Sequence, residues 1–212
     1  MTPTGSIIIV GPLDRFAQAV SLIFHPLIVV IPTMIIVMVR SGATIWQSLF
    51  WTVLSACVAN LPLGILIFHG VRSGHYSDAW VSIREQRRSI YIFYGFSMAI
   101  LLTILIVGKA PVILTACWIS AMLTTVIGYV INHHFTKLSL HSVSTAGCVV
   151  VLFLTTPLLG LIILPFVPLV GWARIRLKYH TPPQILIGWA VPIFSVLVTF
   201  HLFHLFYKSL WF

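Results

Sequence analysis

Charged residues are scarce in this chain. Only 7% of its 212 residues are charged, and just three of these are acidic. A soluble domain carries about 25% charged residues, so an ordinary water-soluble domain is excluded. In contrast, 59% of the residues are hydrophobic and the mean hydropathy is +1.09. We therefore expect an integral membrane protein.

Cysteine is also scarce. Cys57, Cys117 and Cys148 stand singly inside apolar segments, without the paired spacing of a disulfide framework or a zinc site. His201 and His204 lie one helical turn apart, but a metal site needs a further ligand that the neighbouring sequence does not offer. We expect neither a metal nor another cofactor.

Long apolar stretches dominate what is present. A spanning helix needs about 20 apolar residues, and unbroken runs favour helices over the alternating pattern of membrane strands. The sequence predicts an all-α fold, a polytopic transmembrane bundle of six to seven spans forming a single domain over residues 1–212. Pro157, Pro165 and Pro168 leave open that the fifth and sixth stretches form one hairpin of short, kinked helices. The predicted spans are residues 17–39, 48–69, 89–108, 111–131, 141–157, 158–173 and 184–207.

The basic residues are distributed unequally between the two membrane faces. With seven spans, nine of the twelve fall on one face, and the positive-inside rule predicts that this face is cytoplasmic, in the cell (inner) membrane. Because the charges lie in short loops between spans, membrane lipids or a phosphate-bearing lipid are better partners than nucleic acid. The rich face holds Arg15, Arg72, Arg84, Arg87, Arg88, Lys137, Arg174, Arg176 and Lys178; the other holds Arg40, Lys109 and Lys208.

Three loops of the rich face combine cations with imidazoles, at residues 78–88, 137–141 and 173–184. Guanidinium groups bind phosphate oxygens with a matching fork. Two histidines on opposite sides of phosphorus can divide covalent transfer, one as the nucleophile and one as the acid for the leaving alcohol. The sequence therefore predicts a phosphate site at this face.

The third loop resembles the closing motif of the type-2 phosphatidic acid phosphatase superfamily, which includes the vanadium haloperoxidases. That motif reads Ser-Arg, five residues, His, three residues, Asp, and here Ala173-Arg174, His180 and Gln184 keep its spacing. The second family motif, Pro-Ser-Gly-His, is matched in its Ser and His by residues 138–141. The first motif, Lys, six residues, Arg-Pro, is matched loosely by the arginines between 84 and 88.

The resemblance implies a membrane-embedded lipid phosphate phosphatase that acts through a phosphohistidine on a phosphatidic acid- or prenyl phosphate-type substrate. It implies that His180 is the nucleophile, that His141 is the general acid, and that Gln184 orients the nucleophilic ring. The phosphate-binding residues that it implies are Arg174, Arg87, Arg88, Arg84, Lys137 and Ser139.

Some positions depart from the family pattern. Gln184 replaces the orienting Asp, Ala173 replaces a Ser, and Trp80 stands where Arg87 would require the motif lysine. Ser73-Gly74-His75 matches the second motif more literally, but precedes the first. These departures keep open an inactive relative that binds a lipid or pigment as a structural subunit of a membrane complex.

Overall fold

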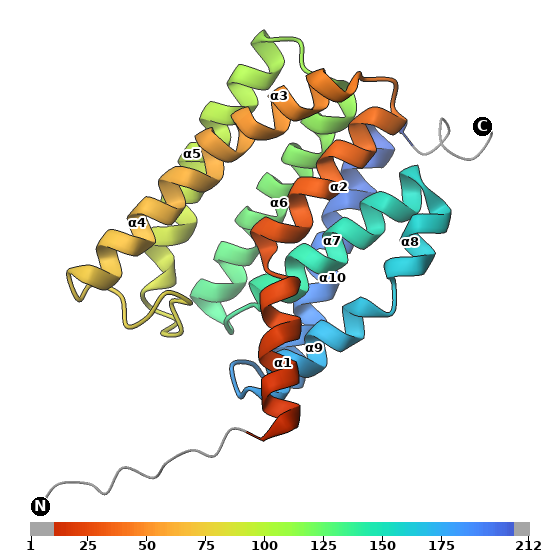
Figure 1. Cartoon of the computed structure of the whole chain (residues 1–212). Helices are drawn as coiled ribbons and strands as arrows, with labels where there is room; N and C mark the ends of the chain where they lie inside the picture. Colours follow the sequence, from red (N-terminus) through yellow and green to blue (C-terminus); the bar gives the residue numbers. More distant parts are fainter. Residues whose placement is uncertain (1–10, 206–212) are drawn as a thin grey trace, which may run out of the picture.

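The computed structural model describes residues 11–205, and every regular element within them is a helix (Figure 1). The predicted all-α fold class is confirmed. The elements are α1 (Pro12–Ile23), α2 (Pro26–Arg40), α3 (Ile45–Ser55), η1 (Ala56–Asn60), α4 (Leu61–Arg72), α5 (Arg87–Val107), α6 (Val112–His134), α7 (Leu140–Thr155), α8 (Pro157–Ile163), α9 (Phe166–Arg176) and α10 (Pro182–Leu202).

Five helical stretches are long and apolar enough to cross a membrane: Ile45–Arg72, Arg87–Val107, Val112–His134, Pro157–Arg176 and Pro182–Leu202. The pair α1 and α2, bent by 43°, makes a sixth if it is one span. The chain is thus an integral membrane protein. The predicted span at 141–157 corresponds to α7, whose 16 residues reach about 24 Å, less than a bilayer core of about 30 Å. Residues 206 and 207 of the last predicted span, and Lys208, lie outside the described residues.

The region from α7 to α9 takes the form of short, kinked helices. The chain breaks at Thr156, and α8 begins at Pro157, where the missing N–H is tolerated at a helix start. Gly160 lets α8 fold back onto α7, because a Cβ there would collide with the backbone of Phe153. After a second break α9 runs beside α1 (Figure 1), and an Asp14–Arg176 ion pair of 2.8 Å joins the two.

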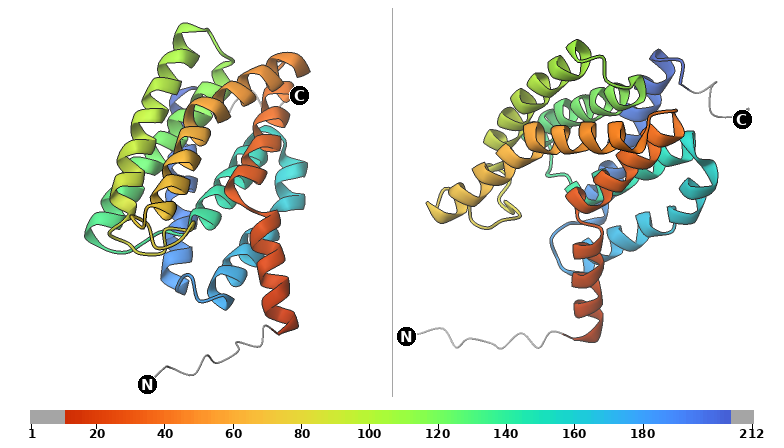
Figure 2. Two further views of the ribbon diagram at one scale, coloured as in Figure 1. Left: turned by 60° about the vertical axis from the view of Figure 1, so that its left-hand side comes forward. Right: turned by 45° about the horizontal axis from the view of Figure 1, so that its top comes forward.

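The apolar core lies between α2, α5, α6, α7 and α10, and Figure 2 shows these helices side by side from two directions. Apolar side chains also cover the outside: Trp46 is 77% exposed and Val107 is 76% exposed. Such an outer surface suits lipid rather than water. The largest core side chains are Met38, Met98, Leu101, Leu105, Leu114 and Phe200.

The connections between helices divide between the two ends of the bundle. Residues 73–86, 135–139 and 177–181 lie at the lower end in Figure 1, whereas 41–44 and 108–111 lie at the upper end. The three loops that carry the predicted phosphate site are therefore brought to one end.

Candidate functional site

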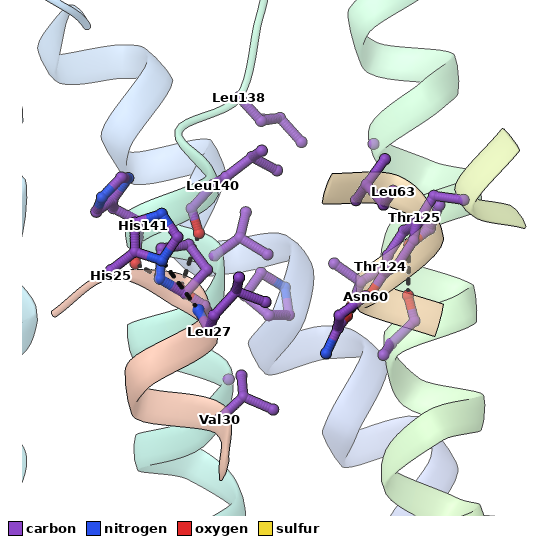
Figure 3. A pocket seen from close by; sticks show the side chains of 18 of the residues that line it. His25, Leu27, Val30, Asn60, Leu63, Thr124, Thr125, Leu138, Leu140 and His141 are labelled. Carbon is purple, nitrogen blue, oxygen red and sulfur yellow. Dashed lines mark hydrogen bonds between the residues drawn. The ribbon is translucent and has the colours of Figure 1, made fainter. Parts of the chain in front are cut away.

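A cavity of about 370 Å³ opens inside this end of the bundle. It runs between α2, α4, α5, α6, α7 and α10, and most of its lining is apolar. Figure 3 shows part of this lining, with His25 and His141 on one wall. Pockets of this size hold small amphiphilic ligands. Its charged end is formed by Arg87, His141, Arg174 and His180.

Arg174, in the last turn of α9, is the most informative of these four residues. Its side chain is only 3% exposed, and its Nε has no hydrogen-bond partner within residues 11–205. The guanidinium carbon lies 4.3 Å from the ring centre of Tyr179 and 5.5 Å from that of Trp80. Cation–π contacts offset part of the desolvation of a buried charge, but an anion would offset much more. The geometry around Arg174 is that of an anion site.

His180 lies between α9 and α10 with its tautomer fixed. Its Nδ1 is 3.1 Å from Gln184 Oε1. The same oxygen accepts from the backbone N–H of Thr181 at 3.2 Å, while Gln184 Nε2 donates to Thr136 Oγ1 at 2.9 Å. Since Oε1 can only accept, Nδ1 carries the proton and Nε2 keeps a free lone pair. This is the form that a nucleophilic imidazole needs.

The charge state of His180 fits the same role. Burial lowers its pKa to about 3, and the nearby charges of Arg87, Arg174 and Lys137 act in the same direction, against the hydrogen bond to Gln184. The imidazole is therefore neutral at pH 7. Burial also lowers the pKa of Lys137.

His141 begins α7 on the other side of the cavity's charged end, and it is 3% exposed. Its Nε2 is 3.1 Å from the carbonyl oxygen of Ser21 in α1. A carbonyl only accepts, so Nε2 carries the proton and Nδ1 is left for a ligand. The ring centre lies 5.4 Å from that of Trp80 and 5.6 Å from that of His25.

Arg87, at the start of α5, lines the cavity but already holds the backbone of two loops. Its Nε donates to Val81 O at 2.7 Å and its Nη1 to Leu138 O at 2.8 Å, with Trp80 O at 3.5 Å from Nη2. A guanidinium has five N–H donors, so two remain. Arg87 therefore ties loop 73–86 to loop 135–139 and can offer a ligand only the donors that face the cavity.

Two predicted phosphate ligands serve the protein backbone instead. Arg84 donates to the carbonyls of Asn132 at 2.5 Å and His133 at 2.7 Å, which satisfies the open C-terminal end of α6. Lys137 Nζ donates to Ser82 O at 3.2 Å. Among the described residues, neither lines the cavity. The structure does not bring Arg84 and Lys137 to the histidines.

Two more lie apart from the cavity. Ser139 is the N-cap of α7, and its Oγ accepts from Ser142 N at 3.4 Å. Arg88 is exposed, one residue past the buried Arg87 on the helix, and so faces another way. Neither is among the described residues that line the cavity. His75, the literal motif match, is exposed and likewise outside that lining.

Three aromatic residues at the site escaped the sequence reasoning as ligand contacts: Trp80, Tyr179 and His25. Trp80 is positioned by Asp78, whose carboxylate accepts from Trp80 N at 2.8 Å. His25 ends the bend between α1 and α2, and its Nδ1 accepts from Leu27 N at 3.3 Å. The seven-residue step from Trp80 to Arg87 was the one available signal, since it marks the motif's lysine position.

No protein-family model, no curated protein and no solved structure matches this chain. Its function therefore has to be inferred from its own residues.

Proposed function

We propose that the protein is a metal-independent lipid phosphate phosphatase, a phosphoric monoester or diphosphate hydrolase acting at the end of the bundle that carries the cavity. The observation that carries this proposal is the buried, unpartnered guanidinium of Arg174 beside two imidazoles of complementary tautomer. A phosphate bound there would pair with Arg174, and the apolar remainder of the cavity would hold the lipid chain.

The proposed reaction has two steps. His180 Nε2 attacks phosphorus, the bond from phosphorus to the lipid oxygen breaks, and that oxygen takes a proton from His141 Nδ1. This requires His141 to be protonated on both nitrogens in the complex, which the negative charge of the bound phosphate favours. Water then attacks the phosphohistidine, His141 takes a proton from it, and phosphate leaves. Arg174 stabilises the charge on the equatorial oxygens.

The positive-inside rule favours the cytoplasm for this end of the bundle, because loops 73–86, 135–139 and 177–181 contribute most of the chain's basic residues. A substrate would then reach the site from the inner leaflet of the cell membrane.

The test is phosphate release by the purified full-length protein in detergent, with lauroylglycerol phosphate as substrate and a chelator present. We expect release from the wild type and a loss of at least about 1,000-fold in His180→Ala. His75→Ala is the matched control and should keep full activity. Undiminished release from His180→Ala would contradict the assigned nucleophile.

A second candidate is a lipid-binding subunit without turnover. It is favoured by Gln184, whose neutral amide raises the basicity of His180 less than the family's carboxylate would. Binding of lauroylglycerol phosphate that depends on Arg174, without phosphate release, would support this role over the phosphatase.

A further inference from the structure

The spanning helix from Ile45 to Arg72 contains one irregular turn. Residues Ala56–Asn60 form the π-helical turn η1 between α3 and α4. Single π-turns are rare and occur frequently at functional sites. The turn ends at Asn60, a polar residue in the middle of a membrane-spanning helix, and Asn60 lines the cavity. Polar side chains at this depth are costly and commonly functional.

The amide of Asn60 is only half satisfied. Tyr94 OH donates to Asn60 Oδ1 at 3.3 Å, and within residues 11–205 the amide nitrogen makes no hydrogen bond to the protein. If the amide were turned over, its oxygen would be free instead, so one polar atom is available in either case. Figure 3 shows Thr124 and Thr125 of α6 beside Asn60, across the cavity from His141.

A second buried donor lies in the same cavity. Trp118 is 5% exposed and its indole Nε1 has no partner within the described part of the chain. It lies seven residues before Thr125 on α6, about 10 Å further along the helix axis. Unsatisfied buried donors are uncommon in folded proteins. Asn60 and Trp118 together make this wall complementary to hydrogen-bond acceptors.

The depth of this wall relative to the charged end can be read along α6. Leu138, whose carbonyl binds Arg87, packs near Gly128: a Cβ added to Gly128 would lie 3.3 Å from Leu138 Cδ1. Thr124 is one turn away from Gly128, about 6 Å along the axis. An ester linkage in an acylglycerol phosphate stands a few bonds from phosphorus, whereas a prenyl or alkyl phosphate has only carbon there.

We propose that the cavity wall around Asn60, Thr124, Thr125 and Trp118 is a second, uncharged subsite that receives the ester or hydroxyl oxygens of an acylglycerol phosphate. The proposal rests on the proposed function for the position of the phosphate at Arg174. It assigns the substrate class: ester-bearing glycerol phosphates over prenyl phosphates.

The test compares the binding of two probes to the full-length protein in detergent. Lauroylglycerol phosphate and dodecyl phosphate have twelve-carbon chains but differ in the ester and hydroxyl. We expect wild type to bind the former about three- to tenfold more tightly, the range for one neutral hydrogen bond. Asn60→Leu should bind the two probes equally, and Arg174→Met should weaken both. Thr103→Val, at an exposed position of α5, is the control.

Equal binding of both probes by wild type, or an unchanged preference in Asn60→Leu, would overturn the subsite. If Asn60→Leu does not fold, Tyr94→Phe frees the amide from its hydroxyl partner and should reduce the preference instead; an unchanged preference there also overturns it. A preserved preference without phosphate release would leave the subsite standing and remove only the phosphatase. Phosphate release without a preference would do the opposite, and no binding of either probe would sink both.

Discussion

Arg87 and Arg174 are both buried at the same end of the bundle, at 7% and 3% exposure, but their surroundings differ. Arg87 donates to main-chain carbonyls of loops 73–86 and 135–139, whereas Arg174 has only aromatic faces and an unpartnered Nε within residues 11–205. The backbone compensates the burial of one cation, and an external anion can compensate the other. Burial of a cation is therefore not enough to identify a ligand site; the decisive feature is what occupies its donors.

Replacing Arg87 should have the largest effect on stability. Arg87→Met strands the carbonyls of Val81 and Leu138 without their partner, which we expect to cost about 3–5 kcal/mol. Thermal unfolding in detergent measures this. The exposed neighbour Arg88→Met should change stability by less than about 0.5 kcal/mol, and an equal loss in both variants would break the contrast between the two arginines.

Arg174→Met should separate binding from folding. We expect it to weaken lauroylglycerol phosphate binding about 100-fold, or ~2.7 kcal/mol, since a charge-assisted pair is lost, without lowering the unfolding temperature. Arg176→Met, two residues further and 44% exposed, serves as the control and should bind normally. A destabilised Arg174→Met that keeps its affinity would show that the guanidinium is structural.

Gln184 tests whether the tautomer of His180 matters. Gln184→Leu removes the acceptor for Nδ1 and should lower kcat about tenfold with little change in KM, because only the reacting form of the ring is lost. Gln184→Glu keeps the acceptor and adds a charge that makes the ring more basic, so its kcat should equal or exceed that of the wild type. Equal rates in all three proteins would refute the positioning role.

The smallest expected effect is on pH-dependent stability. The pKa of His180 is about 3 in the folded protein and about 6.5 in an unfolded chain. As the pH falls below 6.5 the unfolded chain binds the proton first, so this stabilisation is complete above 6.5 and is lost progressively toward pH 3. Between pH 7 and 5.5 we expect a loss of about 1 kcal/mol. His180→Asn should lose correspondingly less over the same interval; identical pH curves would exclude His180 as the source.

Much of the site was predictable because the family motif fixes it locally. Arg174, His180 and Gln184 lie within eleven residues at one helix junction, so their spacing alone predicted that they meet. Arg84 and Lys137 were assigned to phosphate because charge was the only visible signal, but their donors are taken by carbonyls 48 and 55 residues away in the chain. No local pattern reports such partners.

Composition and hydrophobic run length by themselves determined that this is a helical membrane protein with basic loops at one end, since lipid demands apolar surfaces and internally bonded backbone. Only the tertiary structure decided which cation is free, that His141 binds the carbonyl of Ser21 120 residues away, and that Asn60 faces the same cavity. The physical reason is that donor occupancy and cavity shape depend on contacts between distant helices, whereas hydrophobicity is a property of each segment alone.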